Sequence, residues 1–113
     1  MKVKGNRQLY DGILFRSDLE VNHYLGLKAL QQVGRISKLQ YEPKFVFIVN
    51  GVTVGSYKPD FTYLDAQGKV HVDDVKGWKK SKKTGKMLPR VDRGFRVTRN
   101  LMKACFGLEV EIR

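Results

Sequence analysis

Four residues have the types and the spacing needed for chemistry on a phosphodiester bond. Three of them, Glu20, Asp60 and Asp74, are carboxylates, and Lys76 follows the last carboxylate by two positions. Hydrolysis of a phosphodiester uses carboxylate oxygens to hold Mg²⁺, beside a group that steadies the attacking water. The combination therefore predicts a metal-dependent phosphodiesterase site.

Each of these residues also has a simpler explanation when it is considered alone. Glu20 can close a capping box with Ser17, and Asp60 can follow a proline turn. Asp74 and Lys76 can belong to a solvated strand face. Taken together they favour the metal site, because three carboxylates in a basic groove repel a phosphate ligand unless a cation lies between them.

Two helices are expected to frame the site. Apolar residues recur at helical spacings from Ser17 to Gly34 and again from Arg90 to Phe106. The first helix carries Glu20, and the second has a basic outer side. Helices that alternate with strands indicate an α/β fold for a single domain over residues 1–113, with a central mixed β-sheet flanked by helices.

Strands are expected to supply the other site residues. Asn50-Gly51 is a strong hairpin signal, and the basic segment 77–89 lacks periodicity and is predicted to be a surface loop. The predicted strands are residues 39–49, 52–57, 61–65, 69–76 and 108–113.

Period-two alternation decides which side chains share a face of the strand at 69–76. Asp74 and Lys76 point to one face, and Asp73 points to the other. If the strand entered at Asp60 pairs with this strand, Asp60 and Asp74 can reach one metal from adjacent strands. Glu20 could then approach the same point from the first helix.

The balance of charge indicates a polyanionic partner. The 113 residues include 22 Lys and Arg against 11 Asp and Glu, which gives a formal net charge of +11. Contacts with phosphates release counterions, so a basic protein gains affinity for nucleic acid regardless of sequence. A membrane surface is the weaker alternative, because neither end carries an amphipathic basic helix or a lipidation signal.

The lengths of the apolar runs indicate where the protein is located, and the cysteine count indicates which ligands a metal would have. No apolar run reaches the length of a membrane helix, and the N-terminus lacks the apolar core of a signal peptide. The sequence therefore predicts a cytoplasmic protein. Cys105 is the single cysteine, so a metal is expected to use oxygen ligands rather than a cysteine cluster.

The order of these residues resembles the PD-(D/E)xK nuclease superfamily, through Pro59-Asp60, then Asp74-Val75-Lys76, with Glu20 upstream. Between residues 14 and 78 the motifs are similar to those of the phage endonuclease I family, which resolves four-way DNA junctions. Asp74 stands where that family has glutamate, a change that the superfamily pattern allows. The motifs are Phe15-Arg16-Ser17-Asp18-Leu19-Glu20, Tyr41-Glu42, Tyr57-Lys58-Pro59-Asp60-Phe61 and Asp74-Val75-Lys76-Gly77-Trp78.

This resemblance implies a restriction-endonuclease-like core and a Mg²⁺-dependent endodeoxyribonuclease in which Mn²⁺ can substitute. Carried over by position, Glu20, Asp60 and Asp74 are the catalytic acids that hold the metal, and Lys76 is the lysine of the triplet. The implied substrate is a Holliday junction, whose two-fold symmetry implies a homodimer. If the protein is phage-encoded, its location is the cytoplasm of the bacterial host.

Three other functions remain open at this point. A less selective DNA nuclease of the same fold would use the same metal site. A non-catalytic nucleic-acid-binding module, or an RNA- or ribosome-associated basic protein, would use only the positive charge. The three carboxylates argue for the enzyme.

Basic residues around the expected site are candidates for DNA contact. Arg16 precedes the first helix and can hold a phosphate beside the metal, or can pair with Asp18. Trp78 can stack on an unpaired base or anchor its loop. A charge run is often only a solvated face, but this one directly follows Lys76 and is expected at the rim of the site. The other candidates are Lys79, Lys80, Lys82, Lys83, Lys86, Arg90, Arg93, Arg96 and Arg99.

The histidines and most aromatic residues are expected to have structural roles. His23 and His71 lack a partner at metal-ligand spacing. Aromatic side chains bury large apolar areas, so they are expected in the core rather than on a base-stacking surface. These core candidates are Phe45, Phe47, Tyr57, Phe61, Tyr63 and Phe95.

Overall fold

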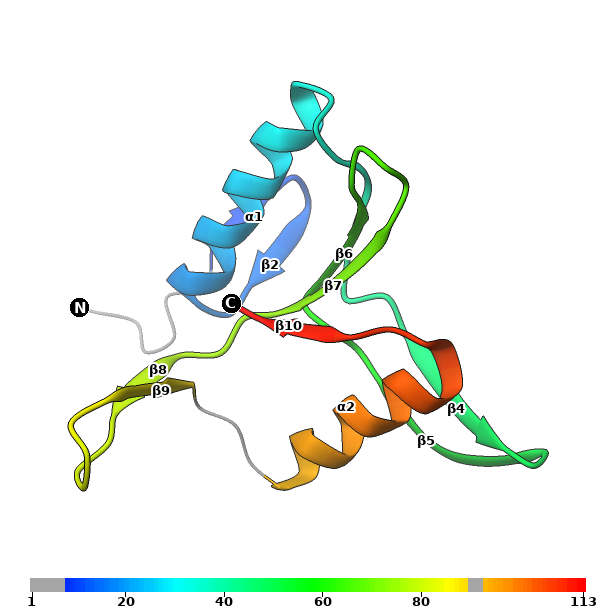
Figure 1. Ribbon diagram of the computed structural model, residues 1–113. Helices are drawn as coiled ribbons and strands as arrows, with labels where there is room; N and C mark the ends of the chain where they lie inside the picture. The colour runs from blue at the N-terminus through cyan, green and yellow to red at the C-terminus, as the bar shows by residue number, and fades with distance from the viewer. Residues whose placement is uncertain (1–7, 90–92) are drawn as a thin grey trace.

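A four-stranded mixed sheet forms the centre of the computed structural model, which describes residues 8–89 and 93–113 (Figure 1). β10 runs parallel to β7, whereas β7 with β6 and β6 with β3 are antiparallel pairs. The predicted mixed α/β architecture is therefore confirmed. In order across the sheet, the strands are β10 (Val110–Ile112), β7 (Val70–Asp74), β6 (Phe61–Leu64) and β3 (Ser37–Tyr41).

The first helix, α1 (Asp18–Gln32), begins at the capping box that the sequence predicts. Ser17 Oγ accepts a hydrogen bond from Glu20 N at 3.2 Å, and Glu20 Oε2 accepts one from Arg16 N at 3.3 Å. The negative charge of Glu20 also suits the positive end of the helix dipole. This cap holds Glu20 at the buried start of α1, where it is 7% exposed.

The two helices cover opposite faces of the sheet. α1 packs on the face that carries Phe61, in a cluster with Phe15. α2 (Arg93–Phe106) packs on the other face, where Met102 meets Val72. All four of these side chains are fully buried, and each contributes about 1.5–3 kcal/mol by leaving water. β7 is therefore fixed from both sides, which determines where Asp73 and Asp74 point.

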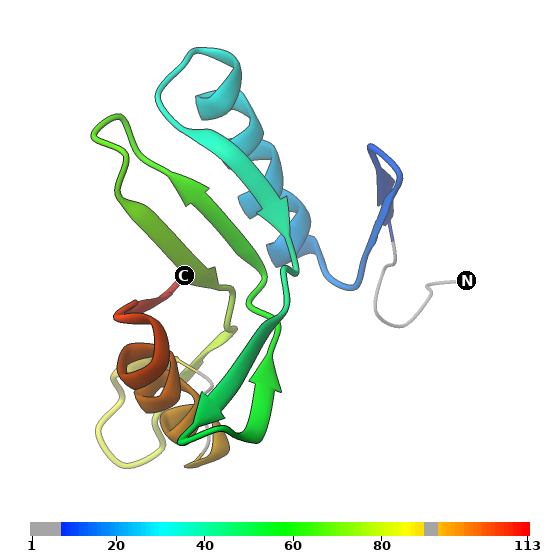
Figure 2. The same cartoon turned by 90° about the vertical axis from the view of Figure 1, so that its right-hand side faces the viewer.

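The predicted strand 39–49 is wrong, because it is divided into β3 and β4 (Phe45–Val49), which belong to different sheets. The break follows from Glu42, which has a φ of +51°, and from Pro43, which cannot donate to a strand ladder. β4 pairs with β5 (Val52–Tyr57) through the predicted turn at Asn50-Gly51. Figure 2 shows this hairpin extending beyond the central sheet beside α2.

Two further hairpins were not expected from the sequence. β1 (Gln8–Tyr10) and β2 (Ile13–Phe15) turn at Asp11-Gly12, a dipeptide that favours such turns. β8 (Trp78–Lys80) pairs with β9 (Met87–Pro89), so the prediction of a surface loop over 77–89 is wrong. The clustered lysines obscured the alternation by which short strands are usually recognised.

The C-terminal segment follows the predicted order of helix and strand. The expected helix start at Arg90 lies outside the described residues, and α2 is described from Arg93. Gly107 has a φ of +68° and ends the helix before β10. Within residues 8–89 and 93–113, no helix combines the length and apolarity needed to cross a membrane.

Candidate functional site

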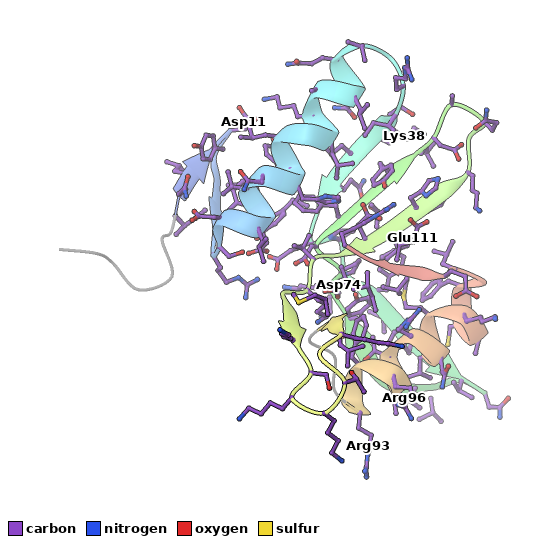
Figure 3. The ribbon with its side chains drawn as sticks, turned by 60° about the vertical axis from the view of Figure 1, so that its left-hand side comes forward. Asp11, Lys38, Asp74, Arg93, Arg96 and Glu111 are labelled. Carbon is purple, nitrogen blue, oxygen red and sulfur yellow. The ribbon has the colours of Figure 1, made fainter. Side chains whose placement is uncertain are left out.

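The four predicted site residues line one open pocket with a volume of about 390 Å³. Glu20 comes from the start of α1, Asp60 precedes β6, Asp74 ends β7, and Lys76 follows two residues later. Figure 3 shows Asp74 at the centre of the molecule, above the β8–β9 hairpin and α2. The fold therefore gathers side chains that lie far apart in the sequence into one pocket.

Strand pairing places Asp60 beside the end of β7. Phe61 is the partner of Asp73 in the β6–β7 register, so Asp60 lies next to the chain that leaves Asp74. Val75 N donates a hydrogen bond to Asp60 Oδ2 at 2.6 Å. Adjacent strands thus deliver Asp60 and Asp74 to one pocket, as the hairpin prediction required.

Two donors hold Asp74, which is 6% exposed. Tyr57 OH donates a hydrogen bond to Asp74 Oδ2, and Lys76 Nζ lies 3.2 Å from Asp74 Oδ1. Lys76 Nζ also lies 4.3 Å from the ring centre of Phe95, a cation–π contact. Burial and the bond to Asp74 raise the pKa of Tyr57, so its hydroxyl remains a donor. Lys76 is therefore fixed on the same face as Asp74.

Negative charge is concentrated around Asp60. Burial raises the pKa of Asp60 to about 7, against the opposing effect of the Val75 N–H. The charges of Asp74 and Glu20, and a hydrogen bond shared with Glu20, raise it further. Asp60 therefore holds a proton over much of the range below neutral pH.

The chemistry of this donor set fits a hard divalent cation. Glu20, Asp60 and Asp74 offer carboxylate oxygens, the ligands that Mg²⁺ and Mn²⁺ prefer. A cation here would relieve the charge repulsion that favours the protonated form of Asp60. Among the described residues, no three acidic, histidine or cysteine side chains are grouped as ligands around one point. Asp74 is instead bonded to Tyr57 and Lys76.

Tyr57 and Glu42 line the pocket although the sequence did not identify them as site residues. Glu42 forms an ion pair with Arg16, which was expected to meet a phosphate or Asp18. The Arg16 side chain is still 64% exposed and lies at the pocket. Both missed residues occur within the motif segments: Glu42 directly follows Tyr41, and Tyr57 is three positions before Asp60. Their positions in these motifs were the signal by which the sequence could have identified them.

Most of the predicted basic residues belong to the β8–β9 hairpin and to α2, which lie below Asp74 in Figure 3. Trp78 and Lys79 lie in β8, while Lys80, Lys82, Lys83 and Lys86 are exposed on the same hairpin. Arg93 and Arg96 are exposed on α2. Arg99 is partly buried and donates a hydrogen bond to Val110 O at 3.4 Å, which gives it a structural contact. Arg90 lies outside the described residues.

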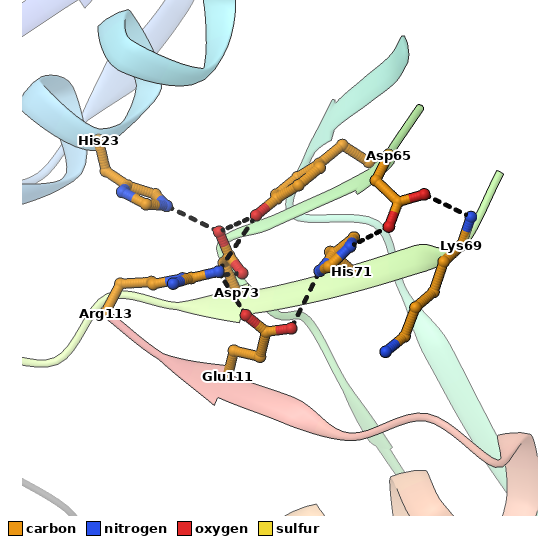
Figure 4. Close-up of polar contacts among 8 residues, drawn as sticks. His23, Asp65, Lys69, His71, Asp73, Glu111 and Arg113 are labelled. Atoms are coloured by element: carbon orange, nitrogen blue, oxygen red, sulfur yellow. Dashed lines mark hydrogen bonds and ion pairs between the residues drawn. The ribbon is translucent and has the colours of Figure 1, made fainter. Parts of the chain in front are cut away.

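Both histidines contact carboxylates on the face of the sheet that α1 covers (Figure 4). His23 Nε2 lies 2.8 Å from Asp73 Oδ2. His71 lies between Asp65 and Glu111, with Nε2–Oδ2 and Nδ1–Oε1 distances of 2.9 and 3.0 Å. The hydrogen bond to Asp65 raises the pKa of His71, and Glu111 adds to this effect while burial opposes it. Asp73 therefore faces away from Asp74, as strand alternation predicts.

Most of the predicted core aromatics are buried. Phe47, Phe61, Tyr63 and Phe95 are at most 8% exposed. Phe45 and Tyr57 are partly buried against the α2 cluster, and Tyr57 uses its hydroxyl in the acidic pocket.

Comparisons with known proteins give a family without an assigned activity. No curated protein and no solved structure matches the chain. A family model matches residues 1–95, a segment that includes all four residues of the acidic pocket and ends at the start of α2. The chain thus belongs to the family described as "Protein of unknown function (DUF1064)".

Proposed function

We propose that this protein is a metal-dependent DNA endonuclease of the PD-(D/E)xK type, with a restriction-endonuclease-like core and a preference for branched DNA. One observation carries the proposal. Glu20, Asp60, Asp74 and Lys76 come from four separate positions of the fold and line one open pocket. The resemblance of the sequence to that superfamily requires the same four residues to meet.

The electrostatics of the chain support a role for a cation. A protein with a net charge of +11 attracts phosphate, yet this pocket is lined by four carboxylates that repel it, the three proposed ligands and Glu42. The raised pKa of Asp60 is a consequence of burial and of that crowding. A divalent cation reconciles the acidic pocket with a polyanionic substrate.

Each residue of the pocket has a defined task in this proposal. Glu20, Asp60 and Asp74 would hold Mg²⁺ or Mn²⁺, which when bound supplies Lewis-acid activation of water and neutralises charge on the phosphoryl group. Lys76, fixed by Asp74 and the Phe95 ring, donates hydrogen bonds to the water or to a phosphoryl oxygen.

Groups outside the acidic pocket would bind and orient the DNA. The exposed guanidinium of Arg16 contacts a phosphate next to the one that is cleaved. The exposed lysines of the β8–β9 hairpin and the exposed Arg93 and Arg96 of α2 bind the backbone without reading bases.

Selectivity for branched DNA and a homodimer are proposed from the resemblance. A four-way junction has two-fold symmetry, so paired cuts require two copies of the pocket. The exposed lysines of the β8–β9 hairpin and the exposed arginines of α2 suit a substrate that is held by its backbone and shape rather than by its sequence.

A non-catalytic binding module is the second candidate, and one observation favours it. The carboxylates already have partners, since Asp60 accepts a hydrogen bond from Val75 N and Asp74 accepts one from Tyr57. In that case the acids would serve only to hold β6, β7 and β5 together.

Cleavage of a synthetic four-way junction, compared with its linear duplex arms, tests the proposal. The purified wild type is incubated with Mg²⁺, with Mn²⁺ and with EDTA, and the products are resolved on a denaturing gel. Nicks near the branch point that need a metal support the branched-DNA endonuclease. Equal cutting of junction and duplex would reject the selectivity, and binding without cleavage in either metal would favour the binding module.

A further inference from the structure

A second pocket of about 870 Å³, also open to solvent, adjoins the acidic pocket, and we call it the second cavity. The two cavities share Ser17, Val75 and Lys76, so they meet at the start of α1 and at the chain that leaves β7. Leu19 and Val75 give the second cavity apolar walls. Its volume lies in the range of roughly 300–1,000 Å³ that is usual for small-molecule sites.

Two planar side chains at the wall of this cavity share one buried carboxylate, and one of them, Arg113, also forms an ion pair with Glu111. His23 from α1 and Arg113 after β10 both line the cavity and both contact Asp73 (Figure 4). Asp73 Oδ2 lies 2.8 Å from His23 Nε2, and Asp73 Oδ1 lies 3.3 Å from Arg113 Nε. Backbone pairing also anchors Arg113, because its N–H donates to Asp74 O at 2.9 Å. The orientation of both planes is therefore determined by the fold.

Burial of a carboxylate destabilises the folded state unless hydrogen bonds and ion pairs offset the loss of its hydration. Asp73 is 0% exposed, and its Oδ1 is buried without a hydrogen bond, although Arg113 lies close by as an ion pair. Holding β7 to α1 would require only an apolar residue at this position. The carboxylate accepts a hydrogen bond from the Tyr63 hydroxyl at 2.9 Å, and it also arranges His23 and Arg113 at the cavity.

The groups around the cavity suit a nucleobase. Guanidinium and imidazole planes stack on bases, and the exposed amide of Asn22 can pair with a base edge. Lys76 lines both cavities. Its positive charge would attract the phosphate that joins a base in the second cavity to the strand in the acidic pocket. A base that is paired and stacked in a duplex cannot enter, because it must first leave the stack.

We infer that this cavity takes an unpaired nucleobase of the DNA, next to the phosphate in the acidic pocket. This inference rests on the proposed nuclease function and specifies its substrate. The cleaved strand carries an unpaired or easily unpaired nucleotide beside the cleavage position, as branch points and bulges do. His23 and Arg113 contact that base, and Asp73 is a positioning residue that acts through them.

Two duplexes that differ in one bulged nucleotide test the inference. One bulge carries 2-aminopurine and the other an abasic residue, and affinities are measured in EDTA so that no metal-dependent cleavage occurs. The wild type is expected to bind the 2-aminopurine bulge about tenfold more tightly, as one stacked base allows. The fluorescence of 2-aminopurine should change on binding as the base moves from the DNA stack into the cavity.

Tryptophan substitutions on α1 test whether the preference for the bulged base arises in the second cavity. Asn22→Trp places a large ring in the cavity at an exposed position and should abolish the preference for the base. Ala29→Trp, on the same side of the helix about 10 Å further along, is the matched control and should retain it. Arg113→Lys keeps the positive charge but removes the planar guanidinium. It should therefore reduce the preference for the 2-aminopurine bulge while largely preserving the affinity for the abasic duplex.

Equal affinity of the wild type for both bulges would overturn the inference, and so would a preference that survives Asn22→Trp. Failure of the proposed nuclease function would give a different result from failure of the base site. If the base preference is present but no DNA substrate is cleaved with Mg²⁺ or Mn²⁺, the base site stands and the nuclease does not. Cleavage of both bulges at the same rate, without a difference in affinity, would leave the nuclease and remove the base site.

Discussion

Replacement of Asp60 by asparagine should stabilise the metal-free protein at alkaline pH and leave it almost unchanged in acid. The folded state holds the Asp60 proton to a pKa of about 7, whereas an unfolded aspartate releases it at about pH 4. Between these values unfolding releases a proton, so the stability of the wild type falls as pH rises through this window. The substituted asparagine would carry no charge and would escape that loss, while its amide oxygen still accepts from Val75 N.

The size of this stability difference follows from the difference between the folded and unfolded pKa values of Asp60. A difference of about three pKa units corresponds to about 4 kcal/mol for an isolated group, and solvent screening and the proton shared with Glu20 reduce this to about 2 kcal/mol. Urea titrations in EDTA at pH 4.5 and pH 8 give the two free energies of unfolding. Glu109→Gln is the control, because Glu109 is exposed and its pKa is lowered by Lys103 rather than raised.

The expected result is that Asp60→Asn is more stable than wild type by about 2 kcal/mol at pH 8 and by less than about 0.5 kcal/mol at pH 4.5. Addition of Mg²⁺ at pH 8 should then stabilise the wild type and not the variant, since binding favours the folded state. Parallel stability curves for the two proteins from pH 4.5 to pH 8 would refute the reasoning about the crowded carboxylates.

Three other predictions concern the surroundings of the site. Replacement of Lys80, Lys82 and Lys83 by glutamine should weaken DNA binding and reduce the salt slope of the affinity by up to about 0.9 per lost phosphate contact, and an unchanged slope would place the β8–β9 hairpin away from DNA. His71→Gln should cost about 1 kcal/mol at pH 5.5 and much less at pH 9, because the raised pKa of His71 gives stability below about pH 6.5 that is lost as the folded state deprotonates. Urea unfolding at the two pH values measures this difference, and an equal loss at both would contradict it. Phe61→Ala, at a fully buried position under α1, should cost about 3–5 kcal/mol in urea unfolding at any pH, and a smaller loss would mean that the sheet face is less tightly packed.

Local signals in the sequence predicted the elements that position the site. Ser17 with Glu20 predicted the start of α1, and Asn50-Gly51 predicted the turn between β4 and β5. Strand alternation placed Asp74 with Lys76, which lie 3.2 Å apart. These features depend on residues within a few positions of one another, which is the range over which backbone geometry acts.

The parts that were missed depend on contacts between distant segments. Tyr57 reaches Asp74 only because β5 folds back beside the end of β7, and Arg16 meets Glu42 rather than Asp18 because β3 ends beside α1. The division of β3 from β4 needed the positive φ at Glu42, which is not a glycine. No local pattern reports such long-range partners.

Cleavage of the four-way junction by wild type and by Asp74→Asn, side by side in Mg²⁺, tests most directly whether the acidic pocket is the active site. Glu109→Gln, which removes a carboxylate from the exposed surface, is the matched control. We predict metal-dependent cleavage by wild type and Glu109→Gln, and no cleavage by Asp74→Asn despite DNA binding that is equal or tighter. Cleavage by Asp74→Asn at the wild-type rate would contradict the assignment of this pocket as the active site.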